Sequence, residues 1–179
     1  MRTSTRPDEL GRLGRLTEEA YTCGLGVGYL LLAGDLPLVL ELPAPSPPAR
    51  RPPGRGVSAW TRALERYFGG EPVTFALDVD AYGEAHGFTA FEFAVYTALA
   101  AVPYGQVVSY RDLAVAAGYP GAYRAVGSAM SRNALPVILP CHRVIKNDGR
   151  LGYYGDDPAW KERLLALEGV RVVGGRVTP

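Results

Sequence analysis

The sequence predicts an α+β protein of two domains, with a strand-rich first half followed by a mostly helical second half. Two β-rich runs, Val27 to Leu32 and Leu36 to Leu42, surround Ala33-Gly34-Asp35 and predict a hairpin. Farther along, two helical segments joined by the glycine-containing turn 118–121 predict a helix-turn-helix unit. The glycines of segment 80–87 indicate a linker, so we expect domains at 1–85 and 86–179.

The composition is that of a folded protein: 47% of the 179 residues are hydrophobic and 21% are charged. A net charge of +1 neither favours nor excludes a nucleic-acid partner. Between Tyr110 and Arg150, however, six basic residues stand against two acidic ones, which fits an anion-binding face or, as the usual alternative, a solvated surface. No early apolar run resembles a signal peptide or a membrane span, so we expect a cytoplasmic protein without membrane association.

In the first half, residues 1–16 lack apolar periodicity and should be loosely attached, and the proline-rich stretch 43–56 should be an exposed loop. Apolar side chains then recur at helical spacing from Trp60 to Phe68, with Ser58 as the N-cap and Gly69 as the stop. Residues 73–79 are a further strand candidate.

The second half begins with a capping box, Thr89-Ala90-Phe91-Glu92, and a helix is predicted from about Ala90 to Val102. Phe88 and Phe93 should form the accompanying hydrophobic staple. Ser109 should cap a helix that runs from Tyr110 to Ala117, and residues 122–132 should form the next helix.

A glycine inside that next helix, Gly127, costs roughly 1 kcal/mol relative to alanine. The position therefore indicates a close approach, either to another helix or to a nucleic-acid groove. A last helix is predicted to start at Pro158, capped by Asp157, and to end at Gly169, before a short extended tail over 170–177.

The tetrapeptide Pro140-Cys141-His142-Arg143 places a nucleophile, a base and a cation in consecutive positions. Thiolate is the reactive form of cysteine, and neighbouring positive charge lowers the pKa of the thiol. A buried structural cysteine is the alternative, and the tetrapeptide alone does not decide between them. With Cys23 and His86 as the only other cysteine and histidine, we expect no metal site.

This tetrapeptide resembles the O6-alkylguanine-DNA alkyltransferases when it is combined with three further features: Arg124-Ala125-Val126-Gly127, Asn133 and Leu164-Leu165-Ala166-Leu167-Glu168-Gly169. The likeness covers residues 88–169 in the family's order and spacing. It implies an RNase H-like N-terminal α/β domain and a winged-helix-like C-terminal domain. It also implies a monomeric DNA repair protein, without cofactor, that moves the alkyl group of O6-alkylguanine, and of O4-alkylthymine, from double-stranded DNA irreversibly to its own Cys141.

The resemblance assigns roles to individual residues as well. His142 would deprotonate Cys141 through a water molecule, Glu168 would hold the imidazole, Asn133 would support the turn and Tyr110 would donate to the departing base. Arg124 would fill the stack left by a flipped nucleotide. The implied DNA contacts are Thr89, Tyr110, Arg124, Ala125, Gly127 and Arg143, and the implied pocket residues are Pro136, Val144, Gly152 and Tyr154.

Three features depart from the family pattern. Tyr123 is larger than the residue that usually precedes the arginine, Gly155-Asp156-Asp157 puts two carboxylates near the pocket, and His86 with Cys23 does not reproduce the zinc ligands of some relatives. Three rival functions fit the sequence less well. An alkyltransferase-like binder lacks the acceptor cysteine, a Cys-His hydrolase would leave the helix-turn-helix idle, and a winged-helix regulator would leave the cysteine cluster unexplained.

Overall fold

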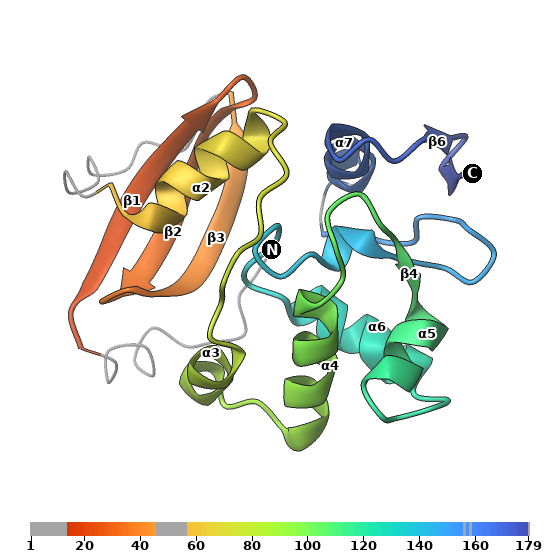
Figure 1. Cartoon of the computed structure of the whole chain (residues 1–179). Coiled ribbons are helices and arrows are strands. Elements are labelled where there is room, and N and C mark those ends of the chain that lie inside the picture. Colours follow the sequence, from red (N-terminus) through yellow and green to blue (C-terminus); the bar gives the residue numbers. More distant parts are fainter. Residues whose placement is uncertain (1–13, 46–56, 156, 158, 179) are drawn as a thin grey trace. The chain divides into compact units, whose positions relative to one another are not determined.

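The computed structural model describes residues 14–45, 57–155, 157 and 159–178, and these form two compact units. The N-terminal unit contains the described residues up to Gly87 together with Ala134–Pro136, and the C-terminal unit contains 88–133 and the chain from Val137 onward. Both are visible in Figure 1. The expected mixture of helix and sheet is confirmed. The expectations for residues 1–13 and 46–56 lie outside the described residues.

A three-stranded antiparallel sheet forms the base of the N-terminal unit, in the order β1 (Leu16–Cys23), β2 (Gly26–Ala33), β3 (Leu36–Ala44). The predicted hairpin is confirmed, with Ala33 paired to Leu36 across the turn. Strand β1 escaped prediction because its inward positions are Glu19 and Tyr21, so its buried face does not stand out as an apolar alternation.

Helix α2 (Ala59–Phe68) packs against β1 and crosses one face of the sheet (Figure 1). Its predicted ends are confirmed, since the Ser58 side chain accepts a hydrogen bond from the backbone N–H of Thr61 and the helix stops at Gly69. Segment 73–79 was predicted to be a strand and 80–87 a linker, and both predictions were wrong. Residues 73–78 instead have no regular secondary structure, and the chain then forms helix α3 (Val79–His86), which Asp78 caps at its start.

The C-terminal unit is mostly helical, and its helices are α4 (Ala90–Ala100), α5 (Tyr110–Ala116), α6 (Tyr123–Arg132) and α7 (Ala159–Leu167). The capping box at Thr89 is confirmed, as is the contact of the Phe88 and Phe93 rings, whose centroids are 5.6 Å apart. Helices α5 and α6 pack on each other and on α4, with Leu113 and Val126 fully buried. The helix-turn-helix arrangement is therefore present (Figure 1).

Short strands complete this unit and bring distant segments together. Strand β4 (Val108–Ser109) pairs in parallel with β5 (Val144–Ile145), so the segment after Cys141 runs beside the start of α5. Strands β6 (Val172–Val173) and β7 (Arg176–Val177) form a small antiparallel pair in the predicted extended tail. Within the described parts of the chain, every helix is too short or too polar to cross a membrane.

Candidate active site

Cys141 begins a single 3-10 turn, η2 (Cys141–Arg143), which leads into β5. The side chain of Asn133, the residue that ends α6, holds this turn. Its Nδ2 donates hydrogen bonds to the Leu139 carbonyl at 2.8 Å and to Cys141 Sγ at 3.0 Å. The amide of Asn133 thus ties the second helix of the helix-turn-helix to the sulfur.

The thiol of Cys141 is only 4% exposed, and this burial raises its pKa. The hydrogen bond from Asn133, the positive charge of Lys161 and a hydrogen bond with Tyr154 act in the opposite direction. Burial is the largest of these effects, so the resting group is a thiol and needs a base before it can act as a nucleophile.

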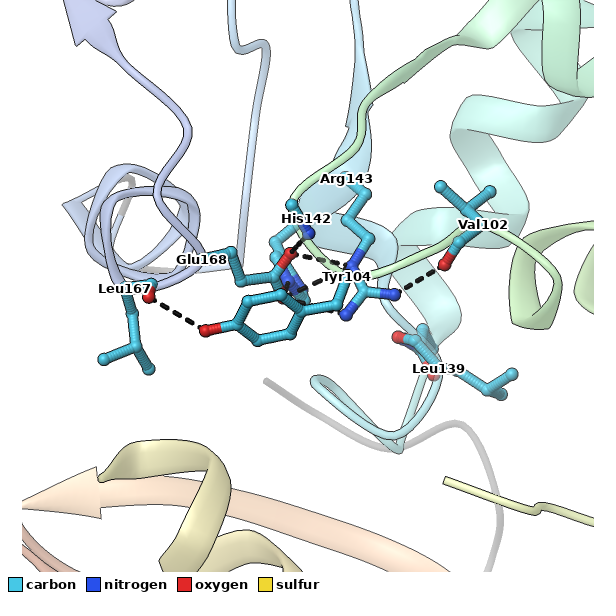
Figure 2. Close-up of polar contacts among 9 residues, drawn as sticks. Val102, Tyr104, Leu139, His142, Arg143, Leu167 and Glu168 are labelled. Atoms are coloured by element: carbon cyan, nitrogen blue, oxygen red, sulfur yellow. Dashed lines mark hydrogen bonds and ion pairs between the residues drawn. The ribbon is translucent and has the colours of Figure 1, made fainter. Parts of the chain in front are cut away.

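His142, the next residue, is fully buried and pairs with the carboxylate of Glu168, which follows α7. The distance from His142 Nε2 to Glu168 Oε1 is 2.6 Å (Figure 2). Burial lowers the pKa of His142 from 6.5, against the opposing effect of Glu168. A neutral imidazole that donates from Nε2 to the carboxylate has Nδ1 as its proton acceptor.

Arg143 also faces Glu168, and Figure 2 shows its guanidinium between that carboxylate and Val102. Nε donates to Glu168 Oε2 at 2.9 Å, one Nη donates to Oε1 at 2.9 Å, and the other donates to the Val102 carbonyl at 2.6 Å. The resemblance implied a DNA contact for Arg143. In the structure this side chain is only 6% exposed, so it lies inside the site and not on its surface.

Two further neighbours complete this cluster, and the sequence analysis named neither. The backbone N–H of Gly105 donates to Glu168 Oε2 at 3.0 Å, and Gly105 has the positive φ of 73° that glycine readily adopts. The hydroxyl of Tyr104 donates to the Leu167 carbonyl at 3.0 Å, and the guanidinium of Arg143 lies 5.9 Å from the centre of its ring. The carboxylate is therefore fixed from several sides.

Lys161 is a functional candidate that the sequence analysis missed. Its side chain is 1% exposed, its Nζ donates to the Val144 carbonyl, and it lies 5.8 Å from the ring centre of Tyr110 and 6.0 Å from that of Tyr154. Burial lowers its pKa to about 8. Its spacing to the buried Leu164 and Leu165 (i, i+3, i+4) was the signal that would have placed it on the inner face of α7.

The predicted pocket residues gather partly around Lys161. Val144 and Tyr154 are buried, and a Cβ added at Gly152 would lie 3.5 Å from the Tyr110 hydroxyl. Burial raises the pKa of Tyr110, so its phenol keeps its proton at neutral pH. Pro136 is buried in the short segment that belongs to the N-terminal unit.

The acidic loop that departs from the family pattern is described only in part. The backbone N–H of Ala159 donates to Asp157 at 2.9 Å, so this carboxylate caps α7 as predicted. Asp156 lies outside the described residues. One of the two additional carboxylates therefore has a structural task at the start of a helix.

The face of α6 that carries Arg124 and Ala125 is exposed. A Cβ added at Gly127 would meet only the ring of Tyr110, at 3.9 Å, so tight helix packing does not explain this glycine. The guanidinium of Arg124 lies 5.8 Å from the ring centre of Tyr123, which is 43% exposed. Thr89 is exposed as well, but its hydroxyl is engaged in the capping box with Glu92.

A buried cysteine followed by a histidine-carboxylate pair, in a unit with a helix-turn-helix and an exposed arginine, is the arrangement of a DNA-binding protein with a reactive thiol. Comparison with known proteins agrees. Residues 90–170 match the family described as 6-O-methylguanine DNA methyltransferase, DNA binding domain. The methylated-DNA-protein-cysteine methyltransferase of Mycobacterium leprae is 39% identical over 148 residues, which cover 79% of this chain and 87% of that protein.

The protein of the same name from Methanosarcina barkeri is 45% identical over 107 residues, covering 60% of this chain and 65% of its own. The crystal structure of Mycobacterium tuberculosis O6-methylguanine methyltransferase superposes with a TM-score of 0.69 at 32% identity, covering 89% of this chain and 96% of that one. A crystal structure of the Mycobacterium tuberculosis protein with DNA gives 0.68, again at 32% identity, covering 84% and 91%. The chain belongs to the methylated-DNA-protein-cysteine methyltransferase family.

Proposed function

We propose that this chain is a DNA repair protein that transfers the alkyl group from O6 of guanine in double-stranded DNA to Sγ of Cys141, once per molecule. The observation that carries this proposal is the buried sulfur followed directly by an imidazole paired with Glu168, in a unit that matches the methyltransferase DNA-binding domain. The related proteins are named for transfer to a cysteine. The non-catalytic alternative lacks the acceptor cysteine, whereas Cys141 is present here.

The reaction is a displacement at the alkyl carbon. The thiolate of Cys141 forms the new carbon-sulfur bond, and the bond between that carbon and guanine O6 breaks with its electron pair on the base. The base receives a proton from the Tyr110 phenol, whose hydroxyl lies beside Gly152. The product thioether is not reversed by ordinary reductants, so each molecule acts once.

The proton of the thiol goes to His142. Because burial keeps Cys141 a thiol and His142 neutral, the pair starts in the state in which proton transfer to Nδ1, through a water molecule, creates the nucleophile. Glu168 then stabilises the imidazolium that forms. The buried ammonium of Lys161 adds positive charge that favours the thiolate.

Guanine O6 is inside the duplex, so the nucleotide must be turned out of the helix, at a cost of a few kcal/mol. The exposed face of α6 suits this step. The half-buried Gly127 leaves room for the minor groove, and Arg124 enters the vacated stack. Phosphate contacts supply the affinity that does not depend on sequence.

Several finer assignments belong to the same proposal. The N-terminal unit is an RNase H-like domain and the C-terminal unit a winged-helix-like domain, with the boundary near residues 85 and 86. Pro136, Val144, Gly152 and Tyr154 line the alkylguanine pocket, and Thr89 contacts DNA beside α4. The protein works as a monomer in the cytoplasm without a cofactor or metal, and also accepts O4-alkylthymine.

Intact-protein mass spectrometry after incubation with a duplex containing O6-methylguanine tests the proposal. We expect the protein mass to rise by one methyl group in place of a hydrogen, in stoichiometric amount, and the rise to vanish in Cys141→Ala. Cys23→Ala is the matched control, since it removes the other cysteine, which lies in the N-terminal unit. Binding to the duplex without any mass change would overturn the proposal.

A further inference from the structure

We propose that Arg143 is a positioning residue that keeps His142 a neutral base, because it supplies the counter-charge for Glu168. The inference rests on the proposed function, which gives His142 the task of taking the proton of Cys141. It assigns a task to an arginine that the sequence analysis placed on the DNA surface.

The first support is geometric. Arg143 and Glu168 form a two-point ion pair through Nε and one Nη, with side-chain exposures of 6% and 0%. The remaining Nη is anchored on the Val102 carbonyl. A guanidinium fixed at three points inside the protein is held against the carboxylate and is not available to a phosphate at the surface.

The second support is the charge of the buried cluster. Glu168 contributes one negative charge and faces two groups that can be positive, Arg143 and His142. With a neutral imidazole the charges of Arg143 and Glu168 cancel, whereas an imidazolium would leave an uncompensated positive charge among side chains that are at most 6% exposed. A buried charge without a partner is costly, so the neutral imidazole is favoured.

Removing Arg143 reverses this balance. Glu168 would then face His142 alone, and an imidazolium would be the only way to neutralise it within the pair. His142 would hold its proton before the reaction and could not accept the one from Cys141. The arginine thus decides which of the two protonation states is the resting one.

The other groups near His142 either oppose its protonation, as Arg143 does, or carry no charge. The ammonium of Lys161 opposes a second positive charge, as Arg143 does, and only Glu168 favours it. Tyr104 lies against the guanidinium of Arg143, and burial raises its pKa, so it remains an uncharged phenol. The N–H of Gly105 and Nε of Arg143 both donate to Glu168 Oε2, while Oε1 pairs with His142 and with one Nη of Arg143.

Histidine NMR on the wild-type protein tests the resting state directly. The chain has only two histidines, so a His86→Gln variant assigns the signals. We expect His142 to be neutral at neutral pH, with its hydrogen on Nε2, and to stay neutral below its ordinary pKa of 6.5. An imidazolium at neutral pH would overturn the inference, and this measurement needs no substitution at Arg143.

Two substitutions then test whether the charge of Arg143 is what keeps His142 neutral. Arg143→Met should raise the pKa of His142 and slow the reaction of Cys141 with free O6-benzylguanine by about tenfold at neutral pH. Arg143→Lys keeps the charge and should leave the His142 titration close to wild type. Arg132→Met is the matched control, because it removes an arginine that pairs with Glu92 at an exposed site of the same unit.

An unchanged His142 titration in folded Arg143→Met would contradict the proposal, and so would a titration in Arg143→Lys that moves as far as in Arg143→Met. The outcomes also separate this inference from the proposed function. Absence of alkyl transfer in the wild type removes the function. Normal transfer with His142 as a resting imidazolium removes only the role of Arg143.

Discussion

Arg143 and Arg124 have the same side chain and belong to the same unit, yet their surroundings are opposite. Arg143 has a side chain that is only 6% exposed, and its guanidinium is bound to Glu168 and Val102. Arg124 is exposed on α6, and the contact described for its guanidinium is with the ring of Tyr123. The first arginine can act only on the charge of the site, whereas the second can reach another molecule.

Two buried glutamates, one in each unit, extend this comparison. Glu19 accepts hydrogen bonds from the backbone N–H of Ser58 at 2.9 Å and from the Thr61 hydroxyl at 3.1 Å, which are neutral donors at the start of α2. Glu168 instead faces an arginine and a histidine. Burial of a charged group therefore does not by itself indicate catalysis; what separates the two sites is whether the partners can exchange a proton.

The largest effect on the transfer rate is expected when the carboxylate of Glu168 is exchanged for an amide, with the same exchange at Glu19 as the control. Glu168→Gln should slow alkyl transfer from a methylated duplex by about a thousandfold, because it removes the negative charge that stabilises the imidazolium formed when His142 takes the proton of Cys141. Glu19→Gln should leave the rate unchanged and lower only the stability, by about 1–3 kcal/mol. Single-turnover rates and urea unfolding measure both. Equal rate losses in folded Glu168→Gln and Glu19→Gln would contradict the distinction between a catalytic and a structural glutamate.

Lys161 provides the next test, because it is a buried cation without a carboxylate partner among its described contacts. Its pKa is about 8 in the folded protein and 10.5 in water, so between these values the unfolded chain binds more protons. The contribution of Lys161 to stability should therefore rise by roughly 3 kcal/mol as the pH increases from about 8 to about 10.5.

The rise in stability with pH should be missing in Lys161→Met. Urea unfolding of the wild type and of this variant between about pH 8 and about pH 10.5 measures the difference. Ionisation of tyrosines that lie away from Lys161 affects the wild type and the variant equally and cancels in the comparison. Identical pH dependence in the two proteins would show that the ammonium is not held in the interior.

The elements that the sequence predicted well are those with strong local signals at their ends. Ser58, Thr89 and Ser109 each cap the helix expected after them. Strand β1 and helix α3 were missed because the first buries a glutamate and the second is a short helix without a clear apolar period. Local pattern is sufficient only where it agrees with the tertiary environment.

The residues of the site divide in the same way, into those with a local sequence signal and those whose position depends on tertiary packing. Cys141 and His142 were recognisable because they are adjacent, and Glu168 followed from the family resemblance. The burial of Arg143 was not predictable, since it depends on how η2 and α7 pack together. Lys161 was missed although its helical spacing to Leu164 and Leu165 places it on the inner face of α7. The positive φ of 77° at Val137, a β-branched residue shortly before the cysteine, likewise has no sequence signal.

The role of Arg124 predicts a smaller effect that depends on the substrate. Arg124→Ala should slow repair of a methylated duplex by about tenfold, because a stacking contact is worth about 1–3 kcal/mol. Reaction with free O6-benzylguanine, which needs no base flipping, should be unchanged. Arg132→Ala, at the other end of α6, controls for the loss of positive charge. A similar loss on both substrates would contradict the stacking role.

The smallest expected effect concerns Tyr123. A cation-π contact at an exposed site contributes about 0.5–1 kcal/mol, so Tyr123→Ala should slow duplex repair by about threefold while Tyr123→Phe should not. Tyr119→Ala is the control, since that ring packs against Phe91 with centroids 5.0 Å apart and its loss should lower the melting temperature instead. Faster duplex repair by Tyr123→Ala would mean that the ring obstructs the groove and does not hold Arg124 in place.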